Sequence, residues 1–135
     1  MKYILVTGAS TGIGYSAVEH LIDAGYRVFG SVRKQDDADS LQSTFGENFT
    51  PLIFDVRDED AISDAVKLVE STLGSNGKLI SIVNNSGIAL GGPIQHLPTD
   101  IYRKQFEVNL FGVVNVTRAF LKLLGAYKGA KHQGR

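Results

Sequence analysis

The chain has 135 residues, a length that suits one domain of ordinary size and is too short for two. Fourteen basic side chains balance fourteen acidic ones, and this zero formal charge argues against nucleic acid or an anionic membrane as a partner. Hydrophobic residues make up 43% of the sequence and cysteine is absent, which excludes bulk disorder, disulfides and thiol chemistry and suits a cytoplasmic location.

Short strand patterns alternate with helical patterns from the N-terminus onward. Lys2–Val6 predicts a buried strand, since its apolar part is too short for a signal peptide and stops at a glycine-rich turn. The apolar stripe over residues 13–22 predicts a helix, which Gly25 ends. Arg27–Val32 predicts the second strand.

A second helix and a third strand follow. The polar segment 34–40 leads to a weak short helix through Leu41 and Phe45. Residues 49–54 predict a strand that ends at Asp55. The alternation of strand and helix therefore continues.

The next helix has the clearest pattern. Acidic residues 58–60 suit its N-terminus, where they meet the positive end of the helix dipole, and residues 74–77 end it. Its apolar face consists of Ile62, Ala65, Val66, Val69 and Leu73. Residues 79–83 then predict a fourth strand, apolar enough to be covered on both faces of a parallel sheet.

A glycine-rich loop at residues 91–93 precedes the last predicted element. Thr99 and Asp100 are expected to cap a long helix that runs to about Leu124. Polar and charged residues interrupt residues 106–124, so this stretch does not reach the roughly 18 uninterrupted apolar residues of a membrane span.

Four strand-plus-helix units in strict alternation predict a Rossmann-like, doubly wound α/β fold whose parallel sheet stops after about four strands. In such a sheet, ligands bind beyond the carboxyl ends of the strands. Functional residues are therefore expected directly after each strand.

Three glycines after the first strand form the leading candidate site. Gly8, Gly12 and Gly14 open directly into a helix, where glycine permits a tight turn and close approach of a phosphate. The helix N-terminus offers free N–H groups and partial positive charge to a pyrophosphate. The pattern predicts dinucleotide binding, and the alternative is a glycine turn that only folding requires.

Motifs after three strands and within the last helix resemble one known family. They are Thr7-Gly8-x-x-x-Gly12-x-Gly14, Asp55-Val56, Asn84-Asn85-x-Gly87 and Asn109. Together they resemble the short-chain dehydrogenase/reductase family. The resemblance covers the whole chain but only about the first half of a typical member, so residues 1–135 are expected to form a single dinucleotide-binding domain, incomplete relative to the family.

The resemblance implies roles for these residues. The pyrophosphate would be lined by Gly8, Gly12 and Gly14, with further donors from Ser10, Thr11 and the Ile13 backbone. Asp55 would accept a hydrogen bond from the adenine amino group, and the Val56 amide would meet the ring; a helix cap or solvated turn is the alternative for Asp55. The ribose and the fourth strand would be supported by Asn84, Asn85 and Gly87, while Ser86 stands where the family usually has alanine.

The end of the second strand decides the cofactor expected. No acid stands there to bind the ribose hydroxyls, and Arg33 offers a planar fork of donors to a 2′-phosphate, with Thr11 and Lys34 in support. The sequence predicts a preference for NADP(H), with NAD(H) as the alternative cofactor. The alternative interpretation of Arg33 and Lys34 is an ordinary solvated strand end.

The family's catalytic serine and Tyr-x-x-x-Lys follow a fifth strand and are expected beyond Arg135. Asn109 is the one member of the catalytic set present, and in the family it bends its helix and anchors a proton-relaying water. Tyr127 and Lys131 match Tyr-x-x-x-Lys literally, but they precede the fifth-strand position and Gly125 and Gly129 disfavour a helix there. No metal site is expected, because the three histidines lack ligand spacing.

The expected function is NADP(H)-dependent hydride transfer between the cofactor and a carbonyl or alcohol substrate, with this chain as the cofactor-binding half. The alternative is a non-catalytic dinucleotide-binding protein or partner subunit. Without a fifth strand, residues 79–83 would form an apolar edge, which predicts a homo-oligomer or a self-associating chain. The last helix would add an unpaired apolar face of Phe106, Leu110, Val113, Val114, Thr117 and Leu121.

Overall fold

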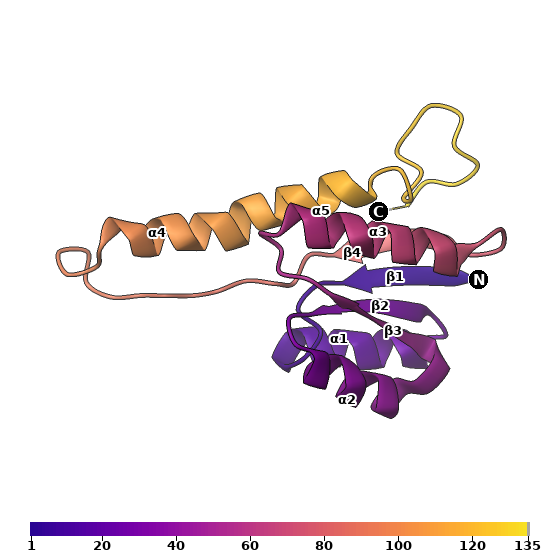
Figure 1. Cartoon of the computed structure of the whole chain (residues 1–135), viewed down its shortest axis with the longest axis horizontal. Coiled ribbons are helices and arrows are strands. Elements are labelled where there is room, and N and C mark those ends of the chain that lie inside the picture. The colour runs from indigo at the N-terminus through magenta and orange to yellow at the C-terminus, as the bar shows by residue number, and fades with distance from the viewer. Residues whose placement is uncertain (135) are drawn as a thin grey trace.

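A four-stranded parallel sheet lies between two layers of helices in the computed structural model, which describes residues 1–134 (Figure 1). The strands are β1 (Lys2–Val6), β2 (Arg27–Val32), β3 (Phe49–Ile53) and β4 (Lys78–Val83), in the spatial order β3-β2-β1-β4. Each neighbouring pair is parallel. The strand order reverses at β1, so the Rossmann-like doubly wound class is confirmed.

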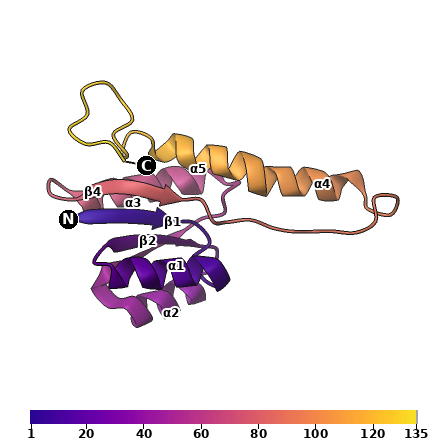
Figure 2. The ribbon, with the colours of Figure 1, turned by 180° about the vertical axis from the view of Figure 1, so that it is seen from behind.

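The helices divide between the two faces of the sheet, as Figure 2 also shows from behind. One layer contains α1 (Gly12–Asp23) and α2 (Gln35–Phe45), followed by a 3-10 turn (Gly46–Asn48). The other layer contains α3 (Glu59–Leu73) and a long rod formed by α4 (Thr99–Phe106), a π-helical segment (Glu107–Phe111) and α5 (Gly112–Phe120). The α4 end of this rod extends beyond the sheet, together with the chain segment that leads to it (Figure 1).

Each face of the sheet buries its own apolar core. Because successive side chains of a strand point to opposite faces, Leu5 packs with α3 and α5 residues, while Ile4 and Val6 pack with α1 and α2 residues. Phe29 and Phe120 are fully buried in the first core, and Phe49 is buried in the second. The predicted apolar face of α3 lies in or against the first core.

Two predicted helix boundaries are wrong. The second helix begins at Gln35 within the predicted polar segment, because its polar side chains face solvent while Ala38 and Leu41 supply the buried face. The long helix ends at Phe120 and not near Leu124, since the Leu121 N–H bonds the Arg118 carbonyl three residues earlier. A turn then follows, and it closes at Gly125, which has a positive φ of 74°.

The expected cap of the long helix is also wrong. Pro98 occupies the N-cap position of α4, and no side chain makes a capping hydrogen bond there. Thr99 and Asp100 are instead the first helical residues, and the Asp100 carboxylate lies 3.9 Å from the Arg103 guanidinium. Proline suits this position because it has no N–H to leave unsatisfied and disfavours helix for the residue before it.

The fourth strand is less covered than predicted. Leu79 is buried, but Ile80, Ile82 and Val83 are only half-buried, because β4 is the edge strand of the sheet in the described part of the chain. Among residues 1–134, no helix is long and apolar enough to cross a membrane.

Candidate functional site

An open cleft of about 480 Å³ lies beyond the carboxyl ends of the strands. Its walls come from the turns that follow all four strands and from α4 and the π-helical segment. The predicted site residues that line it are Gly8, Thr11, Ile13, Arg33, Asp55, Val56, Asn85 and Gly87. Five others do not line it: Ser10, Gly12, Gly14, Asn84 and Asn109.

The N-terminus of α1 opens at this cleft. Its first intrahelical bond runs from the Tyr15 N–H to the Thr11 carbonyl at 3.3 Å, so the N–H groups of residues 12–14 have no carbonyl one turn earlier to bind. The Gly8 N–H is used internally, because it donates to the Ser31 hydroxyl at 3.1 Å. The donors that α1 offers to an anion therefore begin after Gly8.

Gly14 acts as a spacer between helix and turn. A Cβ at this position would overlap the Gly8 carbonyl oxygen and lie 2.5 Å from the Asn85 side-chain nitrogen. The absence of a side chain lets α1 start directly against the turn. Gly14 thus shapes the cleft from behind, which explains why it does not line it.

A buried threonine joins the turns after β1 and β4. The Thr7 hydroxyl accepts hydrogen bonds from the N–H groups of Asn85 and Ser86, both at 2.9 Å. The Asn85 amide donates to the carbonyls of Thr7 and Gly8 at 3.0 and 3.1 Å. Asn85 therefore ties the fourth strand to the first, as expected.

The Asn84 side chain points in a different direction from that of Asn85. Its side-chain nitrogen donates to the Thr117 hydroxyl of α5 at 3.1 Å, away from the cleft lining. Successive residues of an extended segment point to opposite sides, so Asn84 and Asn85 cannot both face the cleft. Asn84 therefore bonds α5 and does not line the cleft, and its contact with a ribose stays a prediction.

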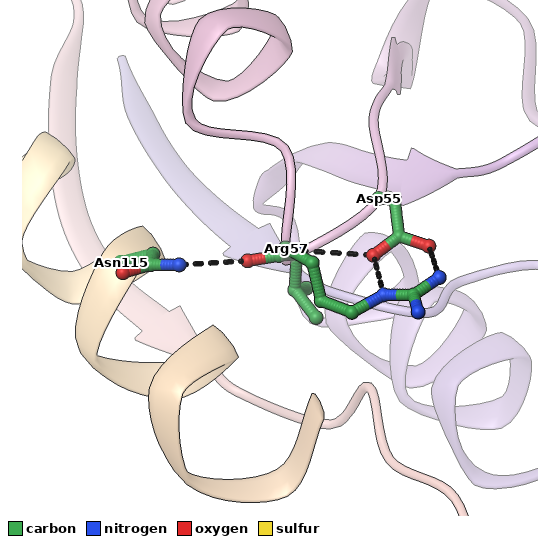
Figure 3. A network of polar contacts seen from close by, with 4 residues as sticks. Asp55, Arg57 and Asn115 are labelled. Carbon is green, nitrogen blue, oxygen red and sulfur yellow. Dashed lines mark hydrogen bonds and ion pairs between the residues drawn. The ribbon is translucent and has the colours of Figure 1, made fainter. Parts of the chain in front are cut away.

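Asp55 and Arg57 form a forked ion pair on the cleft wall (Figure 3). The carboxylate accepts from the Arg57 backbone N–H and Nε at 2.9 Å and from a terminal guanidinium nitrogen at 2.7 Å. These bonds, with the charges of Arg57 and Arg33, lower the pKa of Asp55 to about 2 against the opposing effect of burial. The helix cap is Asp58, which accepts from the Ala61 N–H, so Asp55 is free of that role.

This ion pair predicts an acid-dependent loss of stability. Because the folded-state pKa lies below the ordinary value of 3.8 for aspartate, the stabilisation is present above about pH 4 and is lost as the pH falls towards 2. Asp55→Asn should lower the free energy of unfolding at pH 7 by about 1 kcal/mol, discounted because the Arg57 side chain is 45% exposed.

Urea unfolding at several pH values tests this prediction. The difference in the free energy of unfolding between Asp55→Asn and the unaltered chain should disappear as the pH falls from 4 to 2. Asp64→Asn is the matched control, since it breaks the more exposed pair with Lys67 and should change stability less. A difference in the free energy of unfolding that stays constant over this pH range contradicts the prediction.

Two amide side chains of the long rod hold the extended segment after β4. Asn109 accepts from the Ile88 N–H at 2.8 Å and donates to the Ile88 carbonyl at 2.7 Å. Gln105, one turn earlier, makes the same paired contact with Leu90 at 3.1 and 2.8 Å. Asn109 lies in the π-helical segment, and π-helical turns often occur at functional sites.

The comparisons with known proteins agree with this arrangement. Residues 2–135 match the family model described as short chain dehydrogenase. The chain belongs to the short-chain dehydrogenase/reductase family. It is 44% identical over 135 residues to an NADPH-dependent 3-dehydrocapnine reductase of Ornithobacterium rhinotracheale, covering all of this chain and 47% of that protein.

Solved structures of this oxidoreductase family have the same fold. A serine dehydrogenase of Escherichia coli matches 92% of this chain with a TM-score of 0.83 and 28% identity. An NADPH-bound carbonyl reductase from chicken fatty liver matches 91% with a TM-score of 0.82 and 28% identity. These matches cover 56% and 51% of those chains, so this family member spans about half the length of the relatives it matches.

Several residues of this family member's cleft were not predicted from the sequence. They are Ser31, Val32, Phe54, Arg57, Ser86, Ile88, Leu90, Lys104 and Val108. Ser31 had a detectable signal, because a hydroxyl in an otherwise apolar buried strand needs a partner. Lys104 and Val108 had no signal in the sequence, because only the tertiary structure brings the rod against the strand ends.

The Tyr127–Lys131 segment lies outside any helix of this family member. The chain forms turns there, and Gly125 and Gly129 both have positive φ angles. Tyr127 and Lys131 therefore do not lie one helical turn apart. Within the described residues, no group of histidine, aspartate and glutamate is arranged to hold a metal ion.

Proposed function

We propose that this chain is the cofactor-binding half of an oxidoreductase that transfers hydride between NADP(H) and a carbonyl or alcohol substrate. The cleft beyond the strand ends carries the proposal, because it combines the N-terminus of α1 with the Arg33 guanidinium on one wall. Its volume of about 480 Å³ falls within the usual range for cofactor sites. The bound nicotinamide would supply or accept the hydride.

The N-terminus of α1 would bind the diphosphate. The open N–H groups of residues 12–14 and the positive end of the helix dipole favour an anion there. Ser10 and Thr11 precede these groups in the same turn, and the Thr11 side chain makes no capping bond within the helix. Gly14 lets the helix approach, and Asn85 holds the neighbouring turns together.

Arg33 would distinguish NADP(H) from NAD(H). It follows β2 directly, is exposed, and lines the cleft, whereas the neighbouring Lys34 does not line it. A guanidinium can donate two parallel hydrogen bonds to a phosphate, which a ribose hydroxyl cannot match. The NADPH dependence stated for the relative from Ornithobacterium rhinotracheale supports this preference.

Asp55, Val56 and Gly87 would contact the adenosine part of the cofactor. Asp55 would accept from the adenine amino group, and the Val56 amide would meet the ring edge, since both line the cleft. Asn109 would support catalysis from the π-helical segment by holding the extended segment at Ile88. The ribose contact expected of Asn84 is not part of this proposal, because its amide donates to Thr117.

Calorimetric titration of the chain with NADPH and NADH tests the proposed function. NADPH should bind with saturation at one site per chain and more tightly than NADH. Binding of neither dinucleotide would contradict the proposed function, and tighter binding of NADH would contradict the cofactor preference.

We also propose that the chain self-associates. β4 is an edge strand in the described part of the chain. The adjoining rod and the turn that follows it expose Phe106, Leu110, Phe111, Val114 and Leu121. An exposed strand edge beside an apolar face favours pairing with a second copy. Light scattering across a concentration series should show a mass above 14.6 kDa. A stable monomer at high concentration would contradict this prediction.

A further inference from the structure

The Asp55 carboxylate has one acceptor position that Arg57 does not fill. Each carboxylate oxygen accepts about two hydrogen bonds. Oδ1 accepts from the Arg57 backbone N–H and from Nε, both at 2.9 Å. Oδ2 accepts only from the terminal guanidinium nitrogen, at 2.7 Å, so one of its positions remains open on the cleft wall.

The backbone under this pair is held from several sides. The Asp58 N–H donates to the Asp55 carbonyl at 2.9 Å, and the Asn115 side chain donates to the Val56 carbonyl at 3.3 Å (Figure 3). Val56 is buried, and a Cβ at Gly112 would lie 2.5 Å from its Cγ2, so α5 packs closely against this loop. Because this backbone is held in place and the three hydrogen bonds to the carboxylate come from Arg57, the orientation of the carboxylate depends mainly on Arg57.

We infer that Arg57 is a positioning residue for base recognition: its forked contact fixes the Asp55 carboxylate so that Oδ2 selects a purine with an exocyclic amino group. If the purine carried a carbonyl oxygen at that position, two hydrogen-bond acceptors would face each other, and this contact would be unfavourable. The inference rests on the proposed function, because it requires the dinucleotide to bind in this cleft. Arg57 acts here through its geometry and not only through its charge.

The test compares NADPH with its deamino analogue, reduced nicotinamide hypoxanthine dinucleotide phosphate. The unaltered chain should bind NADPH about tenfold more tightly, because a hydrogen bond to a charged acceptor separates the two ligands. Arg57→Leu should reduce this ratio to about twofold. Arg57→Lys should reduce it similarly, since lysine keeps the charge but loses the planar fork.

Control variants separate positioning from folding and from general charge. Lys67→Leu breaks an exposed carboxylate pair on α3 outside the cleft and should leave both affinities unchanged. Arg57→Leu breaks the same ion pair as Asp55→Asn, so both Arg57 variants should lose no more stability than that variant and remain folded during the titration. The ratio of the two affinities is the decisive quantity, because a merely structural change would weaken both ligands equally.

The outcomes separate this inference from the proposed function. A reduced ratio in both Arg57 variants supports the inference. An unchanged ratio with equal loss of both affinities overturns it, because Arg57 would then act by charge alone. Absence of NADPH binding by the unaltered chain contradicts the proposed function and this inference together.

Discussion

Replacing Gly14 with alanine is expected to lower the free energy of unfolding by about 3 kcal/mol and to abolish dinucleotide binding. The added Cβ would overlap the Gly8 carbonyl oxygen and approach the Asn85 side-chain nitrogen to 2.5 Å. Neither can move freely, because the Gly8 N–H bonds Ser31 and the Asn85 amide bonds Thr7. The start of α1 must therefore shift away from the turn. Urea unfolding followed by circular dichroism measures the loss.

Gly12→Ala is the matched control for this experiment. Gly12 lies two residues earlier in the same turn, where a Cβ would meet no atom within 4 Å. Its φ of 57° is unfavourable for alanine, so a cost of about 1 kcal/mol is expected. Equal destabilisation by Gly12→Ala and Gly14→Ala would contradict the close-packing role of Gly14.

The variant Arg33→Ala is expected to weaken NADPH binding about thirtyfold, equivalent to about 2 kcal/mol, while NADH binding changes less than about threefold. Only NADPH carries the 2′-phosphate that the guanidinium would bind with two parallel donors. Calorimetry at about 0.15 M salt gives both affinities under conditions in which long-range charge effects are screened.

Lys34→Ala controls for charge at the same strand end. Lys34 is exposed and adjacent to Arg33, but it does not line the cleft, so its loss should change NADPH affinity less than about threefold. Equal weakening of NADPH and NADH in Arg33→Ala would show that Arg33 does not distinguish the two cofactors. The Arg33 side chain would then be a solvated strand end, which is the alternative that the sequence leaves open.

Patterns of apolar and turn residues within short stretches of the sequence predicted most of the fold correctly. Lys2–Val6 and Arg27–Val32 are strands with the predicted bounds, because a short segment rich in β-branched and aromatic residues between turn residues can be recognised from the local sequence alone. The apolar face of α3 was equally clear from its helical spacing. The predicted end of the last helix was wrong because the backbone changes to turn hydrogen bonds at Leu121, although Leu124 beyond the helix remains buried.

The candidate site was only partly predictable. The glycine turn and Asn85 follow strands directly, and the strand order of the doubly wound sheet brings these turns to one edge. Arg57 was missed because its role depends on the position of the Asp55 carboxylate, two residues away. Gln105 was missed because its partner, Leu90, lies in an irregular segment without a periodic pattern.

The sequence by itself determined the strand and helix alternation, the glycine turn and the cation after β2, because each depends on residues close together in the chain. Only the tertiary structure decided that Asn84 turns to Thr117 while Asn85 holds the first turn. It also decided that α5 supports the loop carrying Asp55. These contacts join residues more than 30 positions apart, and their geometry follows from how the sheet and helices pack.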